Sequence, residues 1–446
     1  MTGDDVAAAL ADYAVPVSAG QATPAEEDAP SSEPAADLLA DAAVVGLGEA
    51  THGTRECFRA KHRLIRSLVE RHGFRTVAFE AGVAAMLPAD GYVRGGDDGT
   101  GECADAGIAG WRAESPDEAL AKLDKWMWQT DEVRDLLSWL RSFNEGRPPG
   151  DRVRVRGIDL GDPAEPASRL QSYLAAVDPA YAAEADELVS LVDFDASEDD
   201  AASDRRLDEA TDAARSLADR LDQRRESYVE ERSSDEWGVA RHLCRVVEHT
   251  CEWHRVRHEH EGPHPAGMAE RDRLMAGNAA CWKSHDPGEG VVIWAHNSHV
   301  QRGTFDDGQV WTDAETMGEE LALRFGDRYR PVGFDFARGS FRAIPAGSSG
   351  GSDPRVFSVD DPLDASATAR LDALDAESVL LDVSSAADDP RLEDWFDRPR
   401  RLRWVGTVYD PDADPAAHYM RTDLPASFDA LIFLGKSTPT RPLDCA

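Results

Sequence analysis

Short apolar stretches rich in β-branched residues recur along the chain and predict strands that are buried on both faces. Ala43–Leu47 and Thr76–Phe79 lie near the N-terminus, and each leads into polar residues. Gly290–Trp294 is the clearest such stretch in the second half of the chain. Gly- and Pro-rich segments separate the other predicted strands, which are Val153–Ile158, Arg330–Phe336, Val379–Val383, Trp404–Val408 and Leu431–Leu434.

The segment between the first two predicted strands has the periodicity of an amphipathic helix. Thr54 is a suitable N-cap and Gly73 a suitable stop. Two parallel strands joined by a helix form a βαβ unit, which predicts the α/β class. Apolar residues recur on one helix face at three- and four-residue spacing, at Cys57, Leu64, Ile65 and Leu68.

Helical patterns dominate the middle of the chain. Ser115–Asn144 and Met317–Phe325 are predicted helices, and a polar helical region is predicted over about residues 163–285. Within it, the acidic run Asp193–Asp212 is predicted to be a solvated loop and helix start. The expected fold is a three-layer α/β/α arrangement with a largely parallel central sheet and a helical insertion at about 163–285.

The first 35 residues differ in composition from the rest. A short helix is predicted first, and the sequence QATPAEEDAPSSEPAA that follows is typical of a mobile linker. Residues 36–446 are expected to form one α/β domain. The Gly- and Asp-rich segment Tyr92–Gly110 is expected to be a loop over the edge of the sheet where the strands end.

Polar residues follow the predicted strands at their carboxyl ends. Glu49 and His52 follow the first strand, and Glu80 follows the second. Asp159 follows the third and is a candidate for substrate binding, with a turn or cap as its alternative role because glycine and proline come soon after. The carboxyl ends of parallel strands meet at one edge of a sheet, so these side chains are expected to share a site.

A fourth strand end has the same character. The strand predicted at 290–294 leads into AHNSH, in which His296 and His299 flank Asn297 and a serine. One histidine there could be an ordinary core residue, but two beside polar neighbours favour a site, with Asn297 as a candidate for substrate binding. Trp128, in the helix predicted at 115–144, is an aromatic candidate for the same role, with ordinary core packing as its alternative.

Lys61 lies on the apolar face of the first predicted helix. A lysine that faces a sheet costs free energy unless a carboxylate meets it, so a partner among the glutamates at the strand ends is expected. Lysine is rare in this chain, which makes the position more informative. The alternative is a side chain that runs along the apolar surface to reach water. The lysines are Lys61, Lys122, Lys125, Lys283 and Lys436.

This set of residues suits the activation of water. His52 is the predicted general base, with Glu49 or Glu80 on its other ring nitrogen to fix the tautomer. Lys61 is expected to hold the glutamates ionised, and the two histidines of AHNSH to bind the oxyanion or protonate the leaving alcohol. No cofactor is expected. The alternative is a divalent metal on the same Glu and His donors, which defines a metal-dependent hydrolase or a metal-binding protein.

Other motifs in the sequence give little support for a further function. No GxSxG sequence supports a serine nucleophile, and GLGEATHG lacks both the spacing and the lysine of a phosphate-binding loop. A second metal hypothesis rests on a His-rich segment that reads as a loop and has no further ligand motif, so it is the minor one. Its histidines are His254, His258, His260 and His264.

Composition restricts the partners. The formal net charge is −37, from 85 acidic and 48 basic residues, which argues against nucleic acid and anionic membranes. Evenly spread acidity with little lysine is typical of a halophilic surface. The six cysteines show no CxxC spacing, and the N-terminus lacks a signal-peptide pattern, so a reducing cytoplasmic location is expected. The expected partner is a small-molecule ester substrate.

Several stretches, in order, resemble the erythromycin esterase family. The opening GLGEATHGT, a helix with Lys61 and then GFRTVAFEA resemble its first signature, and later blocks follow over nearly the whole chain. This resemblance implies a hydrolase fold, esterase activity on macrolactones or other esters, and a role in antibiotic resistance. A family member that acts in saccharide or envelope metabolism is the alternative. The later blocks are WMWQTDEVRDLLSWLRSFNE, VRVRGIDL, RDRLMAGN, VVIWAHNSHV and FDALIFL.

The resemblance also carries over site residues. Glu49, His52, Glu80 and the histidines of AHNSH match positions of the family's motifs. Lys61 stands at a helix position where the family uses a basic residue.

Overall fold

The computed structural model describes residues 3–17, 33–95, 111–123, 125–192, 200–260, 264–305, 313–348, 353–374 and 376–443. The chain divides into two compact units. Unit 1 comprises residues 1–77, 125–136 and 288–446, and unit 2 comprises residues 78–124 and 137–287. The predicted mobile linker and most of the predicted loop at 92–110 lie outside the described residues.

Unit 1 is built around strands that lie side by side in a fixed order. That order is β1 (Ala14–Pro16), β10 (Ser378–Asp382), β14 (Ala430–Ser437), β8 (Tyr329–Pro345), β2 (Val44–Leu47) and β5 (Val291–Trp294). The pairs β14–β8, β8–β2 and β2–β5 are parallel, whereas β1–β10 and β10–β14 are antiparallel. The α/β class and the largely parallel sheet are therefore confirmed, although the sheet is mixed.

The central strands are buried along their whole length. In β2 and β5 every residue is buried, as expected for parallel strands covered on both faces. Helix α3 (Arg55–Arg71) follows β2, and its buried face carries the four predicted apolar residues together with Lys61. The β2–α3 segment thus has the predicted form, and it presents the loop between them at the carboxyl end of β2.

Smaller elements complete unit 1. Strands β9 (Arg355–Val359) and β12 (Val408–Tyr409) pair with β8, and β11 (Arg400–Arg403) with β13 (Tyr419–Thr422) and β6 (Thr304–Phe305) with β7 (Ala314–Glu315) form two-stranded sheets. The short helices are α1 (Gly3–Ala11), α2 (Glu33–Asp37), α13 (Asn297–Val300), α14 (Met317–Phe325), α15 (Ala367–Asp372), α16 (Val383–Ala387), α17 (Glu393–Phe396) and α18 (Leu424–Ser427), with 3₁₀ turns η2 (Gly326–Arg328) and η3 (Pro415–His418).

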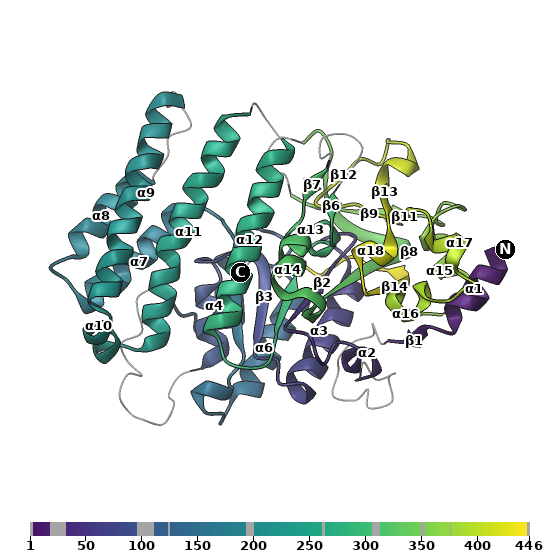
Figure 1. The fold of residues 1–446 in the computed structure, drawn as a ribbon, viewed down its shortest axis with the longest axis horizontal. Helices are drawn as coiled ribbons and strands as arrows, with labels where there is room; N and C mark the ends of the chain where they lie inside the picture. Colours follow the sequence, from purple (N-terminus) through teal and green to yellow (C-terminus); the bar gives the residue numbers. More distant parts are fainter. Residues whose placement is uncertain are drawn as a thin grey trace. The chain divides into compact units, whose positions relative to one another are not determined.

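Unit 2 is mostly helical. Strands β3 (Thr76–Gly82), which starts at the boundary between the units, and β4 (Arg154–Asp159) are neighbours in one sheet. Helices α7, α8, α9 and α11 pack against one another and lie side by side in Figure 1. The helices are α4 (Leu87–Arg94), α5 (Pro116–Ala121), α6 (Asp131–Asn144, which begins in unit 1), α7 (Ala164–Val177), α8 (Ala182–Leu191), α9 (Asp200–Gln223), α10 (Arg225–Glu231), α11 (Ser234–His258) and α12 (Pro265–His285), with the 3₁₀ turn η1 (Pro149–Asp151).

Three predicted elements differ from the structure. The helix predicted over 115–144 is two helices, because Thr130 starts a new one by accepting a hydrogen bond from the amide of Val133. The strand predicted at 404–408 is wrong in its bounds, because Gly406 has a φ of 64° and interrupts the extended chain. Residues 92–94, predicted as loop, belong to α4. Six helices lie in the described residues of 164–285; that they form an insertion stays a prediction.

Candidate active site

Glu49, in the loop that follows β2, is fully buried, and its carboxylate accepts hydrogen bonds from three side chains. Its Oε1 lies 2.6 Å from Nδ1 of His52, and its Oε2 lies 2.6 Å from Nζ of Lys61. The indole N–H of Trp294, at the end of β5, donates to Oε2 over 2.9 Å. Together these contacts hold the carboxylate in one orientation and compensate its burial.

Glycines allow the loop to run this close to its neighbours. A Cβ at Gly53 would lie 2.0 Å from the carbonyl oxygen of Arg342 in β8. Thr54 stands at the N-cap of α3, as predicted, but its hydroxyl makes no capping hydrogen bond. The amide of Arg55 instead donates to the carbonyl of Thr438. The loop that carries His52 is therefore fixed by backbone contacts to β8 and to the C-terminal segment.

Lys61 does not reach solvent. Its side chain is fully buried, and Nζ lies 4.7 Å from the ring centre of Trp294 and 5.4 Å from that of Phe334. The alternative in which Lys61 runs to the surface is thus wrong. An ammonium held between a carboxylate and aromatic faces has both a charge partner and cation–π contacts.

The electrostatics favour an ionised Glu49. Burial acts to raise its pKa, but the charge of Lys61, the hydrogen bond with His52 and the hydrogen bond with Lys61 outweigh burial and lower the pKa. An ionised carboxylate accepts hydrogen bonds, so Nδ1 of His52 is the donor. Nε2 of His52 is then the nitrogen with a lone pair when the ring is neutral.

The second group of histidines follows β5. His296 is the N-cap of α13, and its Nδ1 accepts from the amide of Ser298 over 3.2 Å. In the neutral ring the proton is therefore on Nε2, where it can be donated. The ring centres of His296 and His52 are 5.1 Å apart. The two imidazoles are thus close, with one predicted to accept a proton and the other able to donate a hydrogen bond.

Asn297 and His299 lie in the same short helix and are buried. The amide of Asn297 donates to the carbonyl of Phe334 over 2.7 Å and accepts from the amide of the same residue over 3.0 Å. The side chain of Asn297 therefore links the segment that follows β5 to the backbone of β8. Its contact with substrate, and the role of His299, stay predictions.

Glu80 and Asp159 share a partner in unit 2. Arg271, on α12, donates to Asp159 over 2.9 and 2.6 Å and to Glu80 over 3.0 Å. Burial acts to lower the pKa of Arg271, but the charge and hydrogen bonds of Asp159 raise it above its ordinary value. Arg271 lies in the predicted helical region at about 163–285, and its role was not predicted; the block RDRLMAGN was the available signal. The amide of Asn278, from the same helix, donates to the carbonyl of Ile158.

Trp128 belongs to the aromatic core of unit 1. Its side chain is buried, stacks with Phe58 at 6.5 Å and meets Trp294 edge-on at 5.9 Å. These contacts are those of a core residue that supports Trp294. A contact of Trp128 with substrate stays a prediction.

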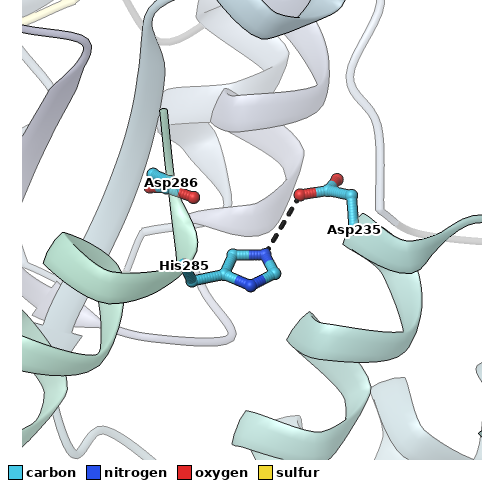
Figure 2. Close-up of side chains that lie close together, drawn as sticks. All are labelled: Asp235, His285 and Asp286. Carbon is cyan, nitrogen blue, oxygen red and sulfur yellow. Dashed lines mark hydrogen bonds and ion pairs between the residues drawn. The ribbon is translucent and has the colours of Figure 1, made fainter. Parts of the chain in front are cut away.

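Unit 2 also contains a group of possible metal ligands made of other residues. Asp235, His285 and Asp286 offer ligand atoms that all lie within 4.8 Å of one another. Figure 2 shows the hydrogen bond between His285 and Asp235. In the His-rich segment, His258 instead contacts Asp204, and His260 stacks on His264. The sequence analysis did not find the Asp235 group, because its members are far apart in the chain.

No helix in the described part of the chain combines the length and the apolar character needed to cross a membrane.

The fold places the protein in the α/β class, and the loop after β2 holds a buried carboxylate against an imidazole. The chain belongs to the erythromycin esterase family, whose model matches residues 69–437. The matched part includes Glu80 and the AHNSH segment, whereas Glu49, His52 and Lys61 precede it. Family membership supports a hydrolase role.

Two curated relatives come from Escherichia coli. Erythromycin esterase type II is 22% identical over 339 residues, which cover 70% of this chain and 73% of that protein. Erythromycin esterase type I is 24% identical over 325 residues, covering 67% and 70%.

Three solved structures share the fold. A protein from Bacillus cereus aligns over 100% of both chains, with 21% identity and a TM-score of 0.77. A succinoglycan biosynthesis protein covers 99% of this chain and 98% of its own, with 19% identity and a TM-score of 0.76. A mutant of erythromycin esterase EreC in its open conformation covers 92% and 94%, with 20% identity and a TM-score of 0.61.

Proposed function

We propose that the protein hydrolyses a carboxylic ester with a water molecule that His52 activates. The contact between Nδ1 of His52 and the buried carboxylate of Glu49 supports this proposal most directly. It leaves Nε2 to take a proton and compensates the charge that the ring then acquires. Glu49, rather than Glu80, is the orienting partner in this proposal.

The proposed reaction has two proton transfers. Nε2 of His52 takes a proton from water as the oxygen attacks the ester carbonyl, and the carbonyl π electrons move onto its oxygen. When the tetrahedral intermediate collapses, the bond to the alkoxy oxygen breaks and that oxygen receives a proton from the imidazolium of His52. The products are an acid and an alcohol, and His52 returns to its neutral form.

His296 is proposed to stabilise the negative charge that develops on the carbonyl oxygen in this step. A neutral imidazole with its proton on Nε2 can donate to the developing oxyanion. His299 is proposed to share that role, while the leaving oxygen receives its proton from His52. Lys61 is proposed to act through Glu49, since it contacts that carboxylate and holds it ionised.

The proposed substrate is a small molecule, and no metal or organic cofactor takes part. A macrolactone is the first candidate, because the curated relatives are erythromycin esterases; cleavage of a macrolide would give the protein a role in antibiotic resistance. The structural likeness to a succinoglycan biosynthesis protein keeps an acylated saccharide as the second candidate. Both candidates are esters, and the same chemistry serves them.

An ester panel tests the proposal. Purified protein at high salt is given macrolactones, acylated saccharides and simple acyl esters, and release of acid is followed by pH-stat and mass spectrometry. Hydrolysis of at least one class that is lost in His52→Ala is expected. His258→Ala, a change at an exposed histidine on α11, is the matched control. An active His52→Ala variant would exclude the proposed base.

A further inference from the structure

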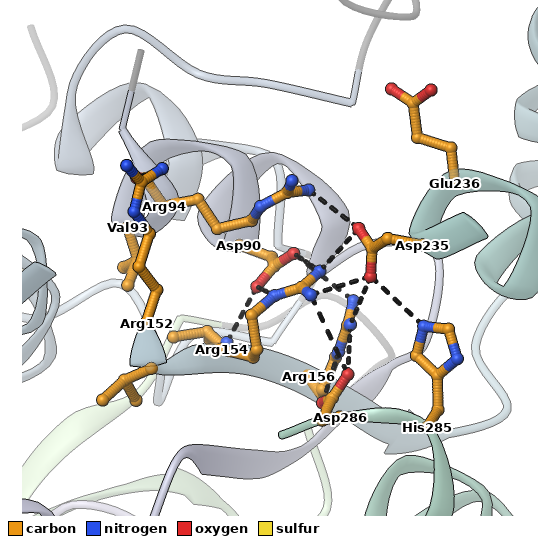
Figure 3. Close-up of polar contacts among 12 residues, drawn as sticks. Asp90, Val93, Arg94, Arg152, Arg154, Arg156, Asp235, Glu236, His285 and Asp286 are labelled. Atoms are coloured by element: carbon orange, nitrogen blue, oxygen red, sulfur yellow. Dashed lines mark hydrogen bonds and ion pairs between the residues drawn. The ribbon is translucent and has the colours of Figure 1, made fainter. Parts of the chain in front are cut away.

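Unit 2 contains a polar cavity of about 390 Å³. Residues from β4 and from helices α4, α11 and α12 meet there, as Figure 3 shows. None of the residues proposed for ester hydrolysis lines it. The lining residues are Arg94, Pro149, Gly150, Arg152, Arg154, Ser234, Asp235, His285, Asp286 and Pro287.

The charged groups at this cavity carry a positive excess. Three guanidinium groups, of Arg94, Arg154 and Arg156, contact the carboxylates of Asp90, Asp235 and Asp286, and Arg152 adds a fourth guanidinium to the cavity lining. The balance is +4 against −3, or +1, in a chain with a net charge of −37. Glu236 is not among the lining residues, and no dashed line joins it to them in Figure 3, although its carboxylate is near enough to Arg94 for their charges to interact.

Two of the arginines use their donors in hydrogen bonds to carboxylates. Arg154 donates to both oxygens of Asp90 and to both oxygens of Asp235. Arg156, which stacks on the ring of Trp282, donates to both oxygens of Asp286. These pairs form a buried scaffold and hold the cavity wall in place.

The other two arginines each have a hydrogen-bond donor without a partner among the described residues. Arg94 donates from Nη1 to Asp235 over 3.0 Å, and its side chain is 38% exposed. Arg152 donates from Nε to the carbonyl of Arg147 and from Nη1 to the carbonyl of Arg94. Within the described part of the chain, Nη2 of each makes no hydrogen bond to protein. These two side chains line the cavity with unused positive donors.

A metal ion is the competing occupant, because Asp235, His285 and Asp286 come within ligand distance of one another. The guanidinium groups argue against it. The carboxylate of Asp235 already meets Arg94, Arg154 and Arg156, and a dication would have to displace these fixed positive charges or lie beside them. Electrostatics therefore favour an anion over a cation.

The start of helix α11 adds to the positive side. Ser234 and Asp235 lie in the first turn of this 25-residue helix, whose amides point toward the N-terminal end with a partial positive charge. Gly238, one turn further, leaves room for the ring of His285, since a Cβ there would lie 2.2 Å from Cε1. His285 is thus held against Asp235 at the cavity wall.

We propose that this cavity binds a small oxyanion, a carboxylate or a phosphate, through Arg94 and Arg152. A guanidinium nitrogen without a protein partner can donate a charge-assisted hydrogen bond to such an anion, and Nη2 of each of these two arginines is available for this. The volume lies at the lower end of the range of small-molecule sites, so one small molecule fits better than a segment of polymer. None of the residues assigned to the proposed esterase chemistry takes part in this site.

Isothermal titration calorimetry of the full chain tests this proposal. Citrate and inorganic phosphate are titrated separately at one fixed KCl concentration, which keeps ionic strength constant. Arg94→Gln and Arg152→Gln should each weaken binding by about tenfold or more, the loss expected for one charge-assisted interaction. Arg324→Gln, at an exposed ion pair on α14, is the control and should bind as wild type. Which probe binds more tightly identifies the oxyanion class.

Two results would overturn the proposal. One is the absence of binding by both probes, or equal binding by wild type and both arginine variants. The other is binding of Mn²⁺ or Zn²⁺ that Asp235→Asn abolishes, because the cavity would then be a cation site. Ester hydrolysis by Arg152→Gln should match wild type, so failure here is distinguishable from failure of the proposed esterase function.

Discussion

Nδ1 of His52 lies 2.6 Å from Oε1 of Glu49, and both side chains are buried. The residues are three positions apart, so one loop supplies both the base and the group that orients it. Because Lys61 contacts the other oxygen of Glu49, the carboxylate is held ionised as well as fixed in position. The proposed base is therefore preorganised before substrate binds.

Removal of His52 should abolish most of the activity. His52→Ala is expected to lower kcat by roughly 10²–10⁴, the usual contribution of a general base. Glu49→Gln should also lower kcat, and the double variant should lose little more than His52→Ala, because the two residues act as a unit. Steady-state kinetics give the rates, and far-UV circular dichroism checks folding. Additive losses would show that Glu49 acts independently of His52.

Lys61 should matter more than an exposed lysine. Lys61→Met leaves a buried carboxylate without its cation, which typically costs about 3–5 kcal/mol of stability when such a pair is broken. Lys122, which pairs with Glu118 on the surface, is the control, and Lys122→Met should cost about 0.5 kcal/mol or less. Denaturant unfolding measures stability, and kcat is measured under conditions where both variants are folded. Equal, small effects on stability and kcat would contradict the role assigned to Lys61.

The β2–α3 part of the site could be predicted because its information is local. The helical period puts Lys61 on the buried face of α3, and the strand pattern puts Glu49 at the end of β2. A buried lysine requires a carboxylate, and Glu49 is near in sequence. Sequence alone therefore sufficed to expect the pair, although the choice between Glu49 and Glu80 needed the structure.

The partners of distant charges could not be predicted in the same way. Arg154 and Arg156 alternate with valine in the predicted strand, and both are buried. Their carboxylates come from residues 90, 235 and 286, on other elements. Arg271 likewise meets Asp159 from 112 positions away. Which charges meet depends on how the helices pack, and periodicity carries no information on that.

A buried aspartate should make stability depend on pH. Asp335, in β8, is fully buried, and burial raises its pKa to about 7, against the lowering effects of Thr368 and Arg403. Between about pH 4 and pH 7 the unfolded chain has lost this proton while the native state retains it, so stability falls as pH rises through this window. The full cost is on the order of 4 kcal/mol and is reached above pH 7.

Asp335→Asn should therefore stabilise the protein at pH 8 and much less at pH 5. The amide keeps the shape of the carboxylic acid, and Thr368 and the amide of Phe336 remain as partners. Denaturant unfolding at both pH values measures the difference. Asp327→Asn, at an exposed position, is the control and should change little at either pH. Equal effects of Asp335→Asn at both pH values would show that Asp335 is ionised in the native state throughout.

The contacts of Glu49 bear on the rival metal mechanism. A divalent ion at Glu49 and His52 would need a carboxylate oxygen with a free lone pair and no cation beside it. Glu49 already accepts from His52, Lys61 and Trp294, and the ammonium of Lys61 would repel a dication unless it lost its charge. Lys61 already neutralises this carboxylate.

Ester hydrolysis is therefore expected to survive exhaustive chelation. Protein treated with chelator, and checked as metal-free by mass spectrometry, should keep most of the kcat of untreated protein at the same salt concentration. Asp235→Asn, which alters the group of possible ligands in unit 2, should behave the same, and this control separates a metal in that group from one at the proposed base. The contrary result is activity that disappears on chelation and returns with one added metal, in wild type and in Asp235→Asn alike. It would mean that the attacking water is bound to a metal near His52 instead of being activated by the imidazole alone.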